Sequence, residues 1–392
     1  MKCTRNVTDH VIWVGANDRR LNLFENLFPI PRGVSYNAYL IKDEKNALMD
    51  TVDASASEQF IENVAYALNG GKLDYLVVQH MEPDHSASIP SFLKKYPKVT
   101  VVSTAKGFQF MEQFFTEFFA GQGLPAEQRI VAANDGVLEL GQHSLHFVYA
   151  PMVHWPEVMM TYEAGEKILF AADGFGKFGA LDVEEEWTDE ARRYYIGIVG
   201  KYGPQVQAVL KKAAGLDIQT ICSLHGPVLK ENLGFYLEKY DKWSSYQPEE
   251  SGVVIAYASV YGNTRNAAEY LADVLQEKGQ KTVLYDLARC DKAKAVADAF
   301  RYDRLVLAGI TYNGDLFPCM RSFIEGLTER NYQNRKVAII ENGTWAPMAG
   351  KLILGMFEKS KNLTFTETTV SIKSAMNEQN KGEIGKLAEE LC

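Results

Sequence analysis

The stretch "VVQHMEPDHSASIP", residues 77–90, decides how the first half of the chain folds. It overlaps the end of an apolar run, "LDYLVVQH" at 73–80, which predicts a buried strand. It runs into "IPSFLKKY", 89–96, where a proline near the start predicts a helix. Between strand and helix lie two imidazoles and two carboxylates within six residues, namely His80, Glu82, Asp84 and His85. Ionisable groups at this density are costly to hold together unless a positive charge lies among them, which indicates a metal site.

Other predicted strands of the first half are also followed by a histidine or an aspartate. Apolar runs at 143–150, 166–172 and 217–224 predict strands, and they are followed by His154, Asp173 and His225. Because the carboxyl ends of strands converge at one edge of a sheet, we expect all seven residues to form one site. Four imidazoles and three carboxylates can give each of two ions two histidines and one terminal carboxylate, with the third carboxylate as a bridge. Nitrogen and oxygen ligands without thiolate suit iron, manganese or zinc, and a two-metal site with open positions can bind a small substrate.

The rest of the first half predicts a mixed α/β pattern. Further strands are predicted at 10–16, 35–41 and 98–104, and a helix at 106–119. We interpret the remaining histidines as solvated or structural, since a lone histidine is more often so than a ligand: His10, His143 and His146. The segment "GFGKFG", 174–179, matches GxGxxG but is not followed by a strand that ends in an acid, so a dinucleotide site is disfavoured. We expect these glycines to let the backbone turn close to Asp173.

The second half is more regular. Strands are predicted at 252–259, 281–287, 304–310, 335–341 and 363–372, with helices at 264–279, 291–300, 319–330, 347–361 and 376–391. Alternating strands and helices predict a doubly wound parallel sheet of order 2-1-3-4-5, with a ligand site at its switch point. The polar stretch "KYDKWSSYQPEESG", 239–252, marks the boundary, and we predict two domains, 1–248 and 249–392.

Three loops follow strands of the second half where such a ligand would bind. In "ASVYGNTRNAAEYL", 258–271, the hydroxyls of Ser259 and Thr264 and the backbone N–H groups of a helix start form an anion cradle. No GK[ST] follows, so this is not a Walker loop, and an ordinary turn with a threonine N-cap is the alternative. The loops "TYNGDLFP", 311–318, and "ENGTWAPMAG", 341–350, each add small residues and an aromatic side chain.

The composition excludes several classes of protein. Asp and Glu outnumber Lys and Arg by 50 to 41, and the net charge of -9 argues against nucleic acid or an anionic membrane as the main partner. Five scattered cysteines without a CxxC pair indicate reduced thiols and exclude a cysteine-bound metal module. The first ten residues hold no apolar signal segment, and no apolar run is long enough to span a bilayer. We therefore expect a cytoplasmic protein.

The second half resembles flavodoxin. The resemblance implies that FMN binds with its phosphate on residues 259–264 and its flavin ring between the other two loops. It implies contacts from Ser259, Val260, Tyr261, Gly262, Asn263, Thr264, Thr311, Tyr312, Asn313, Gly314, Asn342, Gly343, Thr344 and Trp345.

The first half resembles a metallo-β-lactamase-type αββα domain, whose hydrolases usually carry HxHxDH. Here Glu82 replaces the middle histidine, and HxExDH with a later His, Asp and His is the pattern of flavodiiron proteins, also called A-type flavoproteins. The resemblance implies one iron on His80, Glu82 and His154. It implies a second iron on Asp84, His85 and His225, with Asp173 as the bridge.

The family resemblance also implies a function. Flavodiiron proteins reduce O2 to water, NO to N2O, or both, and the sequence leaves the preference open. No extension follows Cys392, so we expect FMN to take electrons from a separate donor, rubredoxin or a deazaflavin. We also expect a head-to-tail homodimer or a dimer of dimers. Two alternatives stay open: a zinc hydrolase fused to a flavodoxin domain, which Glu82 disfavours, and a non-catalytic electron carrier or redox sensor.

Overall fold

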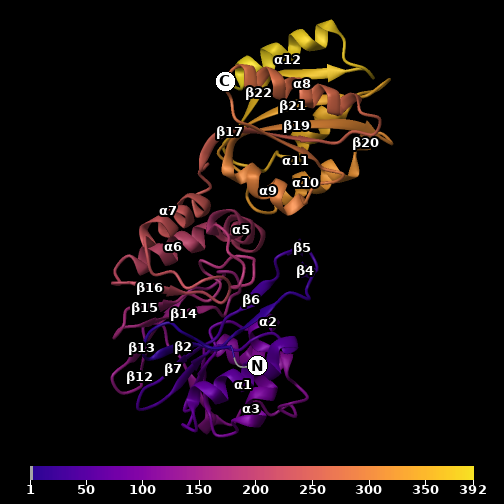
Figure 1. Cartoon of the computed structure of the whole chain (residues 1–392). Coiled ribbons are helices and arrows are strands. Elements are labelled where there is room, and N and C mark those ends of the chain that lie inside the picture. Colours follow the sequence, from indigo (N-terminus) through magenta and orange to yellow (C-terminus); the bar gives the residue numbers. More distant parts are fainter. Residues whose placement is uncertain (1–2) are drawn as a thin grey trace. The chain divides into compact units, whose positions relative to one another are not determined.

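A computed structural model of the chain describes residues 3–392 and divides into two compact units (Figure 1). Unit 1 contains residues up to Tyr195 together with Pro204–Tyr240, and unit 2 contains Ile196–Gly203 and Asp241–Cys392. The domain boundary that the sequence places at 248/249 stays a prediction.

Two main sheets form the centre of unit 1. Among the described residues, the seven-stranded sheet has the order β1 (Arg5–Asn6), β2 (Val11–Trp13), β7 (Tyr39–Ile41), β8 (Ala47–Met49), β9 (Tyr75–Val77), β10 (Thr100–Ser103) and β11 (Arg129–Val131). The five-stranded sheet has the order β12 (Val137–Glu139), β13 (Ser144–Tyr149), β14 (Met159–Glu163), β15 (Ile168–Phe170) and β16 (Thr220–Cys222). Small ladders pair β3 (Ala16–Asp18) with β6 (Val34–Tyr36) and β4 (Leu23–Phe24) with β5 (Phe28–Pro29). One buried core joins both main sheets, because Trp13 and Val77 of the first belong to the same apolar cluster as Phe147 and Phe170 of the second.

Helices connect these strands. Among residues 3–392, seven α-helices lie mainly in unit 1: α1 (Ser57–Leu68), α2 (Pro83–Ser86), α3 (Ile89–Lys95), α4 (Ala105–Phe114), α5 (Trp187–Tyr194), α6 (Gly203–Ala213) and α7 (Leu233–Ser244). The first residue of α6, Gly203, and the last residues of α7 belong to unit 2. Short 3-10 turns lie at Ala54–Ala56, Ala126–Gln128 and Gly200–Tyr202, and a π-helical turn lies at Tyr195–Val199. The Thr104 side chain caps α4 by accepting a hydrogen bond from the Gly107 N–H.

Parts of the secondary structure predicted for unit 1 were wrong. The predicted helix at 106–119 ends at Phe114, because Phe115 already leaves helical geometry with φ −118° and ψ 40°. Strand β14 lies in the middle of its sheet between β13 and β15, yet the sequence analysis assigned no strand to it. All five residues of β14 are buried, so its sequence, "MMTYE", does not alternate between apolar and polar residues.

Unit 2 has one parallel sheet, whose strand order is β18 (Thr282–Asp286), β17 (Glu250–Tyr257), β19 (Tyr302–Tyr312), β21 (Arg335–Asn342) and β22 (Leu363–Ile372). The short strand β20 (Asp315–Leu316) pairs antiparallel with β19. The helices are α8 (Asn263–Glu277), α9 (Lys292–Arg301), α10 (Pro318–Thr328), α11 (Ala349–Met356) and α12 (Glu378–Glu390). The predicted order 2-1-3-4-5 is confirmed. Across residues 3–392, no helix is both long and apolar enough to cross a membrane.

Candidate functional site

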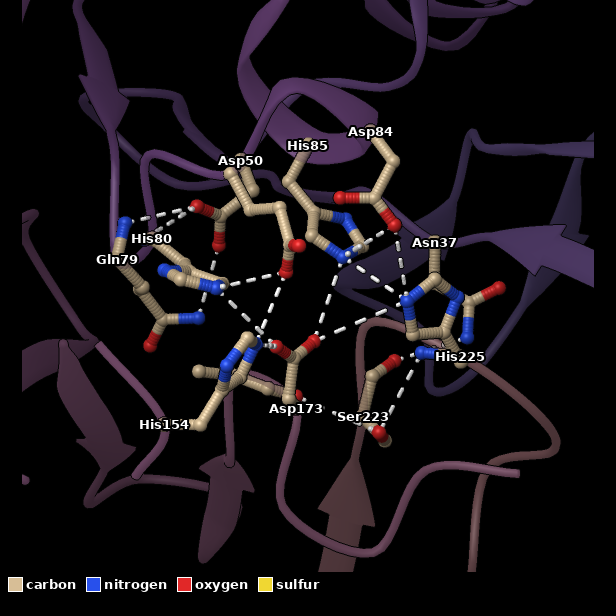
Figure 2. A network of polar contacts seen from close by, with 12 residues as sticks. Asn37, Asp50, Gln79, His80, Asp84, His85, His154, Asp173, Ser223 and His225 are labelled. Carbon is tan, nitrogen blue, oxygen red and sulfur yellow. Dashed lines mark hydrogen bonds and ion pairs between the residues drawn. The ribbon is translucent and has the colours of Figure 1, made fainter. Parts of the chain in front are cut away.

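Seven ligand-type side chains of unit 1 meet where strands of both main sheets end. His80 follows β9 of the seven-stranded sheet, whereas His154, Asp173 and His225 follow β13, β15 and β16 of the other sheet. The prediction that one sheet edge supplies all the strand ends was therefore wrong, and the cluster is shared by two sheets. Figure 2 shows His80, Asp84, His85, His154 and His225 grouped around Asp173.

Three side chains surround one oxygen of Asp173. Its Oδ2 lies 3.2 Å from His80 Nε2 and 3.3 Å from His154 Nε2. Glu82 Oε2 lies 3.3 Å from His80 Nε2 and 2.9 Å from His154 Nε2. These four residues form one group of possible metal ligands.

Three further side chains lie at the other oxygen of Asp173. Its Oδ1 is 3.3 Å from His85 Nε2 and 3.8 Å from His225 Nε2. Asp84 Oδ2 lies 3.3 Å and 3.2 Å from the same two nitrogens, and Asp84, His85 and His225 form a second possible ligand group. Asp173 thus offers one oxygen to each group, which is the arrangement expected of a bridging carboxylate.

The donors fit two metal ions. Within residues 3–392, both carboxylate oxygens of Asp84 and of Asp173 are buried without a hydrogen-bond partner. Buried polar atoms are rarely left unpaired in this way without an ion or other partner. Ligand atoms about 2.1 Å from one ion lie roughly 3.0–3.4 Å from one another, which matches most of the separations in both groups.

The cluster favours positive charge at its centre. Burial alone lowers the pKa of His154, but contacts with Asp173 and Glu82 outweigh burial and raise this pKa to about 9. Burial alone raises the pKa of Asp173, but the nearby histidines lower it well below its usual range. The Asp173 carboxylate therefore stays ionised and is balanced either by protons on the histidines or by metal ions.

A second layer of hydrogen bonds orients the histidines. His80 Nδ1 lies 2.7 Å from Glu157 Oε1, and this oxygen also accepts a hydrogen bond from the Met81 N–H. His225 Nδ1 donates to the Ser35 carbonyl at 2.7 Å. In both rings Nδ1 is held by its partner, and the Nε2 atom faces the cluster. Such hydrogen bonds to the second ring nitrogen fix the orientation of histidines that bind metals. Nothing in the sequence indicates Glu157 or Ser35 as site residues, since each is a single polar residue without a motif.

Aromatic rings cover the flanks of the cluster. Phe24 packs edge-on against His225 with ring centroids 5.4 Å apart, and Trp155 packs edge-on against His80 at 5.3 Å. Tyr194 lies 5.4 Å from the His225 ring, and its pKa is raised well above 10 by burial and by nearby carboxylates. These rings place apolar surface beside the ligands.

Unit 2 contains a pocket at the carboxyl ends of β17, β19 and β21. Its volume is about 430 Å³, within the range of cofactor sites. The lining includes thirteen of the fourteen residues predicted to contact FMN, all except Gly262, and adds Ile310, Ala346, Met348 and Ser374. Gly262 lies between the lining residues Tyr261 and Asn263 in the chain; its N–H donates to Ser259 Oγ at 3.1 Å, and it precedes α8. Its φ of 94° is strained for residues with a side chain, so the first loop depends on glycine here.

Hydrogen bonds hold the loops of this pocket to one another. Asn342 Nδ2 donates to Thr264 Oγ1 at 3.4 Å and to the Ser374 carbonyl at 2.9 Å. Thr311 Oγ1 accepts hydrogen bonds from the N–H groups of Met348 and Ala349. The aromatic residues are left open instead: Tyr261 is 93% exposed and Trp345 is 90% exposed. This combination of an anion-binding helix start and uncovered rings fits a planar phosphorylated cofactor.

Comparisons with known proteins agree with both sites. Residues 34–226 match the ODP family of β-lactamases, and residues 254–362 match a flavodoxin domain family. The anaerobic nitric oxide reductase flavorubredoxin of Klebsiella pneumoniae is 28% identical over 354 residues, which are 87% of this chain and 72% of that protein. The rubredoxin oxygen:oxidoreductase of Desulfovibrio gigas has a similar fold, with a TM-score of 0.91 at 24% identity over 99% of this chain and 98% of that chain. A flavoprotein from Thermotoga maritima gives 0.88 at 25% identity over 100% and 98%.

A β-lactamase-like domain that gathers histidines and carboxylates, followed by a flavodoxin domain, defines a class of two-domain flavoproteins. The chain is homologous to the flavorubredoxins, and its structural neighbours include flavodiiron proteins. The resemblance inferred from HxExDH and the three flavodoxin-like loops is confirmed.

Proposed function

We propose that this protein is an oxidoreductase that reduces O2 to water, NO to N2O, or both. The observation that carries the proposal is Asp173, whose two oxygens each face a separate set of two histidines and one carboxylate. The same chain carries the flavodoxin-like pocket. In this proposal two iron ions and FMN supply the electrons for the reduction.

The residues of the chain hold and orient these groups. We assign one iron to His80, Glu82 and His154 and the other to Asp84, His85 and His225, with Asp173 between them. Glu157 keeps the Nδ1 proton of His80 engaged, so that Nε2 is free to ligate. In unit 2, the N–H groups at the start of α8 bind the phosphate of FMN.

Glu82 favours this function over the zinc hydrolase. A carboxylate in place of the middle histidine adds a hard oxygen donor and a negative charge, which suits redox iron better than hydrolytic zinc. The named relatives are a nitric oxide reductase and an oxygen:oxidoreductase, and neither name describes a hydrolase.

We extend the proposal to partners and location. The relative from Desulfovibrio gigas carries rubredoxin in its name, and we propose a rubredoxin-like protein as the electron donor here, with a deazaflavin as the alternative. We propose a head-to-tail homodimer or dimer of dimers, which sedimentation of the purified protein will test by its mass. A cytoplasmic location is also proposed, because five scattered cysteines without a CxxC pair suit a reducing compartment.

The test is anaerobic reduction of protein that contains iron and FMN, followed by mixing with O2 or NO over repeated turnovers. We expect rapid reoxidation by at least one gas, with water or N2O as the product. The matched control is Glu82→Ala, in which flavin alone should convert O2 to hydrogen peroxide. No reoxidation by either gas, or zinc in place of iron, would contradict the proposal.

A further inference from the structure

A second group of ligand-type side chains lies in unit 1, outside the seven-residue cluster. It consists of His10, His143 and Glu166, and one ligand atom from each lies within 4.8 Å of the others. His10 precedes β2, His143 precedes β13, and Glu166 lies in the turn between β14 and β15. Both histidines were predicted to be solvated or structural, but the fold brings them together across more than 130 positions of sequence.

The group is separate from the seven-residue cluster. Strand β13 runs from His143 towards His154, and β15 runs from Glu166 towards Asp173. Both strands point the same way, because each is antiparallel to β14. His143 and Glu166 therefore lie at the amino ends of strands whose carboxyl ends supply the cluster. The six residues of β13 correspond to a separation of roughly 20 Å.

Hydrogen bonds orient the ligand atoms of this group. His143 Nδ1 lies 2.9 Å from Glu163 Oε1, and the Glu163 carboxylate also accepts the N–H groups of Gly165 and Glu166, each at 2.7 Å. This pairing repeats the contact of His80 with Glu157, and it leaves Nε2 of His143 as the nitrogen that can ligate. On the opposite side, His10 Nδ1 lies 2.8 Å from Glu166 Oε1, while Glu166 Oε2 accepts a hydrogen bond from the Thr8 hydroxyl.

The burial of these groups suits a site with one open side. The His143 and Glu163 side chains are 5% and 0% exposed, whereas those of His10 and Glu166 are 48% and 21% exposed. The turn packs tightly on the inner side, since a Cβ at Gly165 would lie 2.9 Å from Glu163 Oε1 and 3.3 Å from His143 Nδ1. The inner histidine is thus fixed, and the outer two ligands remain accessible to an ion from solvent.

We propose that His10, His143 and Glu166 bind a divalent transition-metal ion, with Zn²⁺ as the preferred ion. Two imidazole nitrogens and one carboxylate oxygen match its donor preference, and water completes the coordination. Such an ion ties the segment before β2 to the β14–β15 turn. The competing explanation is an ion pair of His10 with Glu166 that needs no metal.

The test adds Zn²⁺ to the full-length protein with its iron and FMN in place, removes unbound ions by gel filtration, and counts zinc and iron per chain. Wild type should retain one extra zinc with no loss of iron. His10→Ala and Glu166→Gln should each bind it at least about tenfold more weakly. His146→Ala is the matched control, because His146 lies on β13 outside the group, and it should behave as wild type.

The readout is the difference between wild type and the two ligand variants, so it does not depend on what the seven-residue cluster holds. Zn²⁺ should also raise the melting temperature of wild type and of His146→Ala but not that of His10→Ala. Equal zinc retention by wild type and His10→Ala, or zinc uptake matched by iron loss, overturns the proposal.

Discussion

The metal cluster of unit 1 and the pocket of unit 2 are organised in opposite ways. The cluster is made of buried side chains, and His80 and His85 are fully shielded from solvent. Partners such as Glu157 hold its rings in ligand geometry. The pocket is organised through its backbone and small hydroxyls, while the rings of Tyr261 and Trp345 are almost fully exposed. The comparison teaches that removing a side chain should damage the first site far more than the second.

The largest effect is expected for Glu82→Ala. This change removes one ligand from a group of four and leaves His80 and His154 with only one of the two carboxylates that they share, Asp173. We expect iron affinity at this position to fall by more than roughly 100-fold, beyond the loss seen for outer partners, and FMN content to stay normal. Iron and flavin analysis measures both. Glu139→Ala, at an exposed strand position, is the control, and normal iron in Glu82→Ala would refute the ligand assignment.

A smaller effect is expected for Asn263→Ala combined with Thr264→Val at the start of α8. Loss of about two hydrogen bonds to the phosphate should cost about 2 kcal/mol, or roughly 30-fold in FMN affinity. Iron content should not change. Flavin fluorescence titration measures the affinity, with Thr369→Val as the control because Thr369 is exposed on β22. Unchanged FMN affinity would show that the phosphate binds elsewhere.

Glu157→Gln probes how much of the metal affinity comes from outside the ligands. The amide keeps the shape of the side chain but removes the charge beside His80 Nδ1. We expect about a tenfold loss of iron affinity, because outer partners of metal-ligating histidines typically contribute 10- to 100-fold. Competition with a chelator measures the loss. Retention equal to wild type would mean that the ligands alone organise the cluster.

The smallest effect is expected for Trp345→Ala. A ring that is 90% exposed has little packing to lose, so only its stacking on the flavin is at stake. Aromatic stacking contributes about 0.5–1.5 kcal/mol, which predicts a 2- to 12-fold weaker FMN complex. Trp345→Phe should retain most of the affinity. A loss above 100-fold would show that the pocket depends on its side chains as the cluster does.

The two sites also differ in what the sequence could predict. The six residues from His80 to His85 carry four ligand-type side chains beside one strand, so local sequence was sufficient to predict a metal site there. Thirteen of fourteen predicted pocket residues line the pocket, because loops after parallel strands always gather at one edge. Glu157 is 77 positions from His80, and nothing local connects them. The pairing of His10 with Glu166 spans 156 positions and required the fold of both sheets.

The central claim is that Asp173 bridges two iron ions, and anomalous diffraction at the iron edge from crystals of the iron-loaded protein tests it most directly. We predict two peaks about 3.5–4 Å apart. One should lie among His80, Glu82 and His154 and the other among Asp84, His85 and His225, with Asp173 between them. A single peak, or a signal at the zinc edge alone, would contradict the account.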